Sequence, residues 1–211
     1  NIKDLNNEHP AKKYLLDRKI PEDKIGLFYY AERFKRWVNT QKQTFDSLQN
    51  DRPRIIIPLI SADGTWFGIQ GRSLAPTSTL RYITIMFDDK LKLFGQDQIN
   101  PEQTVYVTEG PFDSTFITNA VAMCGSDVDN STLPYRDRVW VFDNEPRNRQ
   151  IVDRIERTIN TNDPVVIWPK GVRQKDINDM ALAGLDPSAI IKNNTYQGLE
   201  AKLKLTDWKK V

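Results

Sequence analysis

Apolar runs in the first half of the chain predict short helices followed by antiparallel strands. Residues 54–60 (RIIIPLI) are almost continuously apolar, which is typical of a buried strand. Asp63-Gly64 is a hairpin signal, and residues 66–70 are the expected return strand, closed by Gly71-Arg72. The remaining elements expected here are helices that begin at Pro10 and Pro21 and a strand over residues 82–87.

The second half alternates between strand and helix, and this order predicts a mostly parallel sheet with helices on its faces. The pattern changes at Pro101. Four strands are expected, at residues 104–108, 121–123, 138–142 and 165–168. Helices are expected after the first, third and fourth of these strands, at residues 111–117, around residues 151–159 and at residues 178–183.

The chain is therefore expected to be an α/β protein in three parts. Residues 1–100 form an α+β subdomain, residues 101–195 a Rossmann-like sheet domain, and residues 196–211 a basic tail that is helical up to Leu205. With 211 residues, 39% of them hydrophobic and 27% charged, the chain can bury a core. It has no run of roughly 18 apolar residues, which a membrane helix needs.

The chain contains one cysteine, Cys124, and one histidine, His9. These two residues cannot form an internal disulfide or a structural zinc site, so no zinc is expected in this chain. Any metal must be held by oxygen ligands, which favours Mg²⁺ or Mn²⁺. A reducing cytoplasm is the expected location.

The net charge of +2 hides an asymmetry between the two halves of the chain. Residues 1–100 contain 16 basic and 12 acidic residues, whereas residues 101–211 contain 14 basic and 16 acidic residues. A basic half next to an acidic half suits a polyanion that is held against a metal site.

Acidic residues follow three of the strands expected in the parallel sheet. Glu109 follows the first strand, with Asp113 in the next turn. Asp143 and Glu145 follow the third strand, and Asp176 comes after the fourth, beyond a short loop. Neighbouring strands lie about 4.8 Å apart, so carboxylates at their ends repel one another unless a cation lies between them. A divalent metal removes that conflict.

Helix capping is the simpler explanation for each of these residues alone, because acidic side chains often cap helix N-termini. Asp113 or Asp143 taken singly is typical of a cap. Glu109, however, precedes Gly110-Pro111, and Glu is not a preferred capping residue. The cluster as a whole favours a metal site, whereas for Asp176 the two explanations are about equally good.

The same residues resemble a known family. Glu109-Gly110, Asp143-x-Glu145 and Lys175-Asp176-x-Asn178-Asp179 are similar to the motifs of the Toprim domain of primases and topoisomerases. Glu145 stands where that family has the second Asp of a DxD motif, which puts its role as a direct ligand in doubt. Gly125-Ser126 is similar to the family's Gly-Thr.

Motifs in the first half resemble bacterial-type DNA primases rather than other Toprim enzymes. The opening Tyr14-Leu15 with Arg18-Lys19-Ile20, the hairpin between Arg54 and Arg72, and Leu93-Phe94-Gly95 are all similar to segments of the primase core, in the same order. The resemblance covers most of residues 10–185, and the compact layout is similar to primases of large tailed phages.

The resemblance implies a DNA primase core that makes RNA primers on single-stranded DNA from ribonucleoside triphosphates. It implies Mg²⁺ or Mn²⁺ at Glu109, Asp143 and Glu145, with Asp113 and Asp176 as further ligands. The basic residues that it implies as contacts of nucleic acid or nucleotide are Arg54, Arg72, Arg81, Lys90, Lys92 and Lys175. A replicative helicase is the implied protein partner, and the cytoplasm, of the host for a phage protein, is the implied location.

Two alternatives remain open. A Toprim metal-dependent nuclease would share Glu109, Asp143 and Glu145, although the Gly71-Arg72 hairpin argues against it. A non-catalytic module that binds DNA or tethers a helicase could have kept the fold and lost the activity, and the departure at Glu145 is consistent with such a loss.

Overall fold

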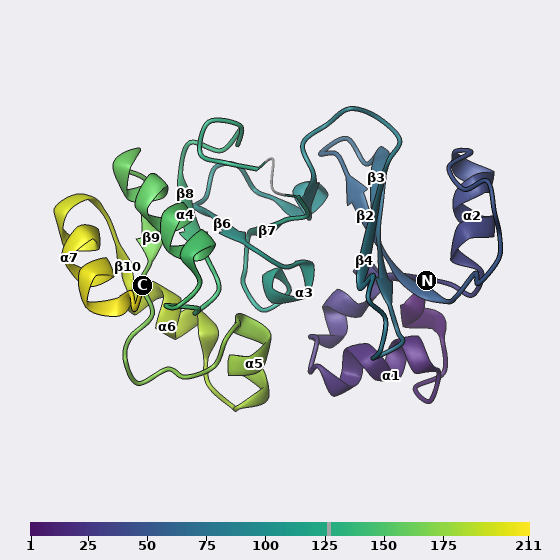
Figure 1. Cartoon of the computed structure of the whole chain (residues 1–211), viewed down its shortest axis with the longest axis horizontal. Coiled ribbons are helices and arrows are strands. Elements are labelled where there is room, and N and C mark those ends of the chain that lie inside the picture. The colour runs from purple at the N-terminus through teal and green to yellow at the C-terminus, as the bar shows by residue number, and fades with distance from the viewer. Residues whose placement is uncertain (126–127) are drawn as a thin grey trace. The chain divides into compact units, whose positions relative to one another are not determined.

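The computed structural model describes residues 1–125 and 128–211. The Gly125-Ser126 motif therefore lies partly outside the described residues. The chain divides into two compact units, residues 1–97 and 98–211 (Figure 1). None of the helices within the described residues is long and apolar enough to cross a bilayer.

The first unit is built on an antiparallel sheet with the strand order β1-β2-β3-β4. The strands are β1 (Tyr29–Ala31), β2 (Arg54–Ile60), β3 (Trp66–Ser73) and β4 (Tyr82–Met86). Residues 1–97 also contain η1 (Ile2–Asp4), α1 (Pro10–Asp17), η2 (Glu22–Leu27), α2 (Phe34–Gln41) and β5 (Leu93–Phe94), and η3 (Gln96–Gln98) spans the boundary. The hairpin between β2 and β3 turns at Gly64, whose φ of 84° is left-handed, as the sequence predicts.

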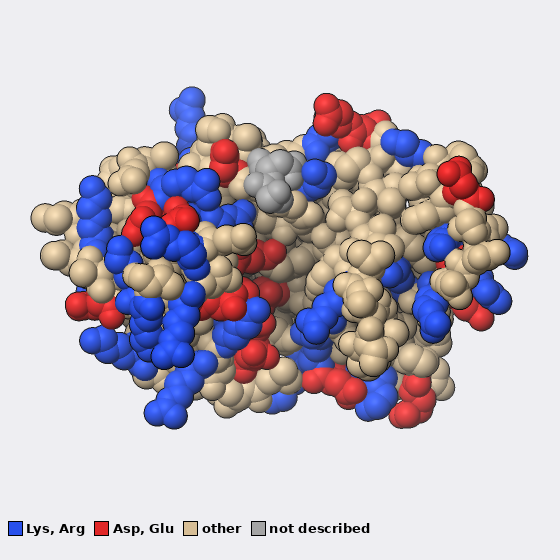
Figure 2. Space-filling view, viewed as in Figure 1, with Lys and Arg blue, Asp and Glu red and all other residues tan. Residues whose placement is uncertain are grey.

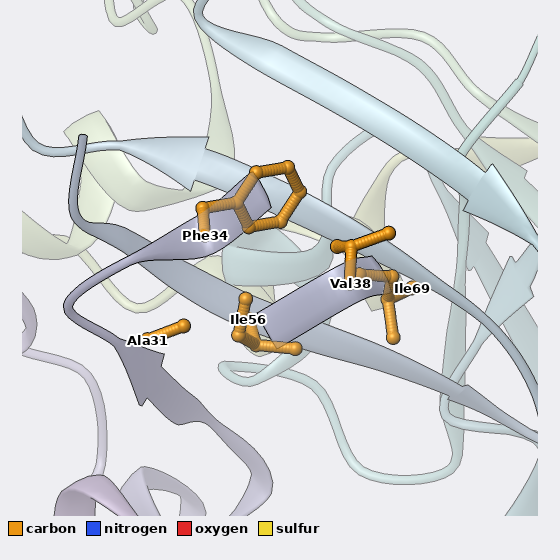
Figure 3. Close-up of a cluster of buried hydrophobic side chains, with 5 residues drawn as sticks. All are labelled: Ala31, Phe34, Val38, Ile56 and Ile69. Carbon is orange, nitrogen blue, oxygen red and sulfur yellow. The ribbon is translucent and has the colours of Figure 1, made fainter. Parts of the chain in front are cut away.

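Helix α2 covers one face of this sheet, and the sequence pattern did not predict it. Phe34 and Val38 on α2 pack against Ala31, Ile56 and Ile69 from β1, β2 and β3 (Figure 3). Neighbouring residues of β2 face opposite sides of the sheet, and those beside Ile56 are buried as well. Apolar side chains on both faces explain why residues 54–60 lack the alternation of a half-exposed strand.

Gly71 is required by the close approach of α2 to β3. A methyl group at this position would overlap the ring of Phe34 and lie 3.1 Å from Cδ of Arg54. Arg54 is itself buried, with a residue exposure of 8%. Its guanidinium donates to the carbonyl oxygens of Gly71, Leu80 and Arg81, so it ties β2 to β3 and to the segment before β4.

The second unit contains five strands in the order β10-β9-β8-β6-β7. The pairs β6–β7, β6–β8 and β8–β9 are parallel, and β9–β10 is antiparallel. This arrangement confirms the predicted α/β class and the mostly parallel sheet. The strands are β6 (Val105–Thr108), β7 (Ala120–Met123), β8 (Arg138–Val141), β9 (Val165–Val166) and β10 (Thr195–Tyr196).

The helices of the second unit form two groups, one with α3, α5 and α6 and one with α4 and α7 (Figure 1). They are α3 (Pro111–Ser114), α4 (Arg149–Asn160), α5 (Ile177–Leu182), α6 (Pro187–Asn193) and α7 (Gly198–Trp208). Helix α3 ends three residues earlier than predicted. The hydroxyls of Ser114 and Thr115 donate to carbonyl oxygens three residues back, and such side-chain bonds compete with helix continuation.

The C-terminal segment is part of the second unit rather than a separate tail. β10 pairs with β9, and α7 packs on α4 and buries Leu205 and Trp208. The ammonium of Lys209 also forms a 2.8 Å ion pair with Glu156 on α4. The predicted tail, residues 196–211, therefore has to be corrected: its basic side chains are held on a folded surface.

The close contact at Gly71 leads to a stability prediction. Gly71→Ala should lower the free energy of unfolding by about 1–3 kcal/mol, because the added methyl group must push Phe34 or Arg54 out of a packed position. Gly26→Ala is the control, since its methyl group would meet only Lys3 Cδ at 3.7 Å, an ordinary contact. Urea unfolding measures both variants, and an equal effect would contradict the packing described here.

Candidate metal centre

The ends of β6 and β8 lie side by side. In the parallel register Thr108 on β6 pairs with Val141 on β8, so Glu109 and Asp143, which follow these strands, are brought together. The backbone N–H of Asp143 donates to Glu109 Oε2 at 2.9 Å. The sequence prediction that these two carboxylates share one edge of the sheet therefore agrees with the structure.

Glu109 is held from two directions. One carboxylate oxygen accepts the Asp143 N–H, and the other lies 2.7 Å from Nη1 of Arg154 on α4. The side chains of Glu109 and Arg154 are 16% and 23% exposed, so solvent screens this ion pair only partly. The role of Arg154 could not be predicted from the sequence, because an arginine in the middle of an amphipathic helix is typical of a solvated charge.

The acid–base equilibrium of Asp143 is strongly perturbed. Burial and the negative charges of Glu109, Asp113 and Asp176 raise the pKa of the Asp143 carboxyl from 3.8 to about 8, and the positive charge of Lys175 only partly opposes this shift. A carboxyl group in this setting holds its proton near neutral pH unless a cation offsets the surrounding charge. The shift shows that the charges of three neighbouring carboxyl groups reach Asp143.

Asp113 and Asp176 also make local structural bonds. Asp113 Oδ1 accepts the backbone N–H of Asn178 at 2.9 Å and so links α3 to α5. A methyl group at Gly110 would collide with the other oxygen of Asp113, which explains the glycine in the Glu109-Gly110 motif. Asp176 caps α5 by accepting the N–H of Asp179 at 2.7 Å, as the capping explanation predicts, while its charge still reaches Asp143.

Glu145 contacts different partners. Its Oε2 lies 3.5 Å from Nζ of Lys175 and 3.4 Å from Nδ2 of Asn148. Lys175 also lies 3.8 Å from Asp143 Oδ2, so its ammonium is the positive charge shared by the two carboxylates. Burial lowers the pKa of Lys175, but the charges of Glu145 and Asp143 outweigh burial, and the net shift is upward. Lys175, predicted to contact nucleotide phosphate, thus lies beside two of the predicted metal ligands.

The cluster does not form a ready-made coordination shell. Among residues 1–125 and 128–211, no three His, Cys, Asp or Glu side chains are already gathered in an arrangement that could hold a metal ion. Arg154 occupies one oxygen of Glu109, and Lys175 stands beside Asp143 and Glu145. The donor set nevertheless suits a hard cation, because it consists of carboxylate oxygens with unbalanced negative charge.

Asn144 holds the loop between Asp143 and Glu145 in place through hydrogen bonds. This role, too, could not be predicted from the sequence. Nδ2 of Asn144 donates to the carbonyl oxygens of Val172 and Gln174, and its Oδ1 accepts from Nε1 of Trp208, all at 3.0 Å. Its backbone N–H donates to the Lys175 carbonyl at 2.6 Å. An asparagine between two acids suggests little more than a turn, so the sequence offered no signal for this role.

The basic residues predicted in the first unit fall into different environments. The predicted contact of Arg54 with nucleic acid has to be corrected. Arg54 is buried and its guanidinium donates to backbone carbonyl oxygens, so it stabilises the sheet and does not face a phosphate. Arg72 is half-buried, donates from Nε to the Tyr14 hydroxyl at 3.1 Å, and stacks 4.8 Å from the centre of the Tyr82 ring. Tyr82 is 41% exposed.

The other three predicted contacts lie nearer the surface. Arg81 and Lys90 are exposed, and Lys92 is half-buried. The ammonium of Lys90 donates to the Ser61 hydroxyl at 3.0 Å and lies over the Phe67 ring. Arg72, Arg81, Lys90 and Lys92 therefore remain candidates for contact with phosphate or base.

Comparisons with known proteins find similarity to DNA primases in both sequence and structure. No protein-family model matches the chain. Over 214 aligned residues it is 35% identical to the DNA primase of Enterobacteria phage T4, covering 98% of this chain and 62% of that protein. The chain thus spans less than two thirds of the length of this relative.

Solved structures with the same fold are primase catalytic domains. The Aquifex aeolicus primase with its zinc-binding and RNA polymerase domains matches with a TM-score of 0.67 at 17% identity, over 93% of this chain and 59% of that one. A DnaG catalytic domain bound to single-stranded DNA matches at 0.64 and 18% identity, over 95% and 76%. The E. coli primase catalytic core matches at 0.63 and 17% identity, over 94% and 76%.

The raised pKa of Asp143 predicts how pH affects stability. Below about pH 4, the folded and unfolded chains both hold this proton, so Asp143→Asn should match the parent. Between about pH 4 and pH 8, the unfolded chain gives up the proton while the folded chain, with a pKa of about 8, retains it. The metal-free parent should therefore lose stability over this range, and Asp143→Asn should not.

Urea unfolding in the presence of a chelator, at about pH 4, 6 and 8, measures this difference. Asp153→Asn is the control, because Asp153 is 46% exposed on α4 and its ion pair within the described residues is with Arg149 on the same helix. An advantage of Asp143→Asn over the parent that does not grow with pH would contradict the electrostatic description of the site.

Proposed function

We propose that this chain, a relative of the phage T4 DNA primase with the fold of bacterial primase catalytic cores, synthesises RNA primers on single-stranded DNA. The observation that carries the proposal is the meeting of Glu109 and Asp143 at one sheet edge, with the pKa of Asp143 raised to about 8 by burial and by neighbouring carboxylates. Such a site favours a divalent cation, and nucleotidyl transfer to a growing primer needs one.

Glu109, Asp143 and Glu145 would hold Mg²⁺ or Mn²⁺, with Asp113 and Asp176 close enough to add their negative charge. When bound, the ion neutralises charge on the phosphates of the incoming nucleotide. Glu145 already contacts Lys175 and Asn148 through its carboxylate, so an ion bound there would compete with these two partners.

The residues of this chain prepare the site in two ways. Arg154 fixes one oxygen of Glu109, and the Asp143 N–H fixes the other, so the carboxylate is oriented before any ligand arrives. Lys175 is 55% exposed and balances Asp143 and Glu145. Once a cation takes over that balancing role, the ammonium becomes available to a triphosphate, which is the role proposed for it.

The wider assignments belong to the same proposal. Ribonucleoside triphosphates are the substrates and single-stranded DNA is the template, contacted through Arg72, Arg81, Lys90 and Lys92. A replicative helicase is the proposed protein partner, and the cytoplasm, of the host if the protein is encoded by a phage, is the proposed location. The support for these is the primase relative and the shared fold.

Primer synthesis with labelled ribonucleotides on single-stranded DNA tests the proposal. Glu109→Gln should abolish synthesis while the chain remains folded, because the amide keeps the shape and loses the charge. It should cost only about 1 kcal/mol of stability, since Arg154 loses a charged partner at a partly exposed site. Glu102→Gln, at an exposed position in the same unit, is the control and should synthesise normally.

Three other outcomes would contradict the proposed function or the proposed metal site. Near-normal synthesis by Glu109→Gln would place the metal elsewhere. Metal-dependent cleavage of DNA by the parent without nucleotides, and no synthesis, would favour the nuclease. Binding of DNA without either reaction would favour the non-catalytic module.

Arg72 supplies a separate prediction about nucleic acid. Arg72→Ala should weaken binding of two unrelated single-stranded oligonucleotides alike and flatten the dependence of log affinity on log salt by about 0.7, the effect of one lost phosphate contact. Arg36→Ala, an exposed arginine on α2 of the same unit, should leave the slope unchanged. A strong preference for one oligonucleotide, or an unchanged slope in Arg72→Ala, would place the surface elsewhere.

A further inference from the structure

A second hollow lies beside the Asp143–Glu145 loop, within the second unit. It has a volume of about 500 Å³ and is bounded by Asn144 and Pro146 after β8, by Lys170 and Arg173 after β9, and by the C-terminal end of α7. A neighbouring hollow of about 320 Å³ lies over Glu145 and Arg147. Both hollows share Pro146 and Lys210, so they adjoin, and the two together are called the groove.

The groove is basic. Four cationic side chains line it, and all four are exposed: Arg147, Lys170, Arg173 and Lys210. Among the described residues, none of the four has a carboxylate partner, in contrast to Lys175 and Lys209 nearby. Two carboxylates, Glu145 and Asp207, also line the groove. Figure 2 shows blue side chains gathered over this part of the second unit, where α7 ends and the loop to α5 runs.

The walls of the groove are fixed rather than loose. Trp208 is only 7% exposed and donates to Asn144 Oδ1. The same Asn144 side chain holds two carbonyls of the loop after β9, and the backbone N–H of Lys210 donates to the Pro146 carbonyl at 2.8 Å. The three segments that carry the cations are therefore joined through the loop that also carries Asp143 and Glu145.

We propose that this groove binds the phosphates of a single-stranded nucleic acid chain that runs past the carboxylate cluster. Within the described residues, the four cations have no ion pair that must be broken before an anion binds, so their full charge is available to attract it. Their distribution along two joined hollows matches the repeating charge of a polynucleotide better than the compact charge of one triphosphate. Exposed Arg and Lys with little aromatic surface favour phosphate contact over base reading.

The inference deepens the proposed function by adding a nucleic-acid surface on the second unit, and it rests on that function only for the identity of the chain that is bound. The groove itself rests on charge and geometry. Its test must therefore measure binding separately from primer synthesis.

The test compares two triple variants of the full chain. The groove variant is Lys170→Ala, Arg173→Ala and Lys210→Ala. The control is Arg136→Ala, Lys192→Ala and Lys202→Ala, which removes the same charge from exposed positions of the same unit outside the groove. Affinity for a labelled single-stranded oligonucleotide is measured over a salt series. A separate arm measures binding of a nucleoside triphosphate with Mn²⁺.

The groove variant should flatten the slope of log affinity against log salt by about 2, since about 0.7 is lost for each of three contacts. The control should change the slope much less, and triphosphate binding should be equal in both. Equal slopes in the two variants would overturn the inference. So would loss of triphosphate binding in the groove variant with oligonucleotide binding intact, because the groove would then serve the nucleotide.

Primer synthesis by the parent distinguishes this failure from failure of the proposed function. A parent that binds DNA through the groove and synthesises nothing would refute the proposed function and leave the groove in place. A parent that synthesises primers, with a groove variant that binds like the control, would refute the groove alone.

Discussion

Repulsion between carboxylates at the ends of β6 and β8 is the constraint around which the second unit is organised. The parallel register places Glu109 and Asp143 at the same edge, and burial removes the water that would screen them. The chain offsets this repulsion with its own groups: Arg154 and a backbone N–H on Glu109, and Lys175 beside Asp143. The pKa of Asp143 nevertheless stays near 8, so the compensation is incomplete, and this supports the proposed cation site.

The same loop connects the cluster to its surroundings. Asn144 lies between Asp143 and Glu145, and its side chain holds the loop after β9 and the indole of Trp208. The hydrogen bonds of Asn144 therefore connect the carboxylate loop to the walls of the groove. Helix α7 belongs to this arrangement because it buries Trp208, although the sequence presents its end as a basic tail.

Features set by local chemistry could be predicted from the sequence. The apolar run at residues 54–60, the left-handed turn at Gly64 and the acids that follow β6 and β8 each carry their signal within a few residues. Features set by distant contacts could not be predicted. Arg154 contacts Glu109 across 45 positions of sequence, and nothing around it in α4 distinguishes it from a solvated arginine.

For Arg154 no role was predicted, whereas for Arg54 a role was predicted that the structure does not support. A basic residue at the start of a strand suggests a surface contact, yet its guanidinium turns inward to carbonyls supplied by β3 and the segment before β4. Burial of an arginine depends on acceptors brought from 17 to 27 residues away. No local sequence pattern indicates that arrangement. The repulsion between Glu109 and Asp143, in contrast, could be expected because both residues follow predicted strands of one parallel sheet.

The central claim is that the cluster around Asp143 is a site for a divalent cation. Electron paramagnetic resonance of Mn²⁺ tests it most directly, because free Mn²⁺ gives a strong signal that is lost on binding. Titration of Mn²⁺ into the parent should show the free-ion signal suppressed, and Mg²⁺ added afterwards should restore it. Asp143→Asn should bind far less Mn²⁺, with Asp153→Asn unchanged. Equal binding by the parent and Asp143→Asn would contradict the claim.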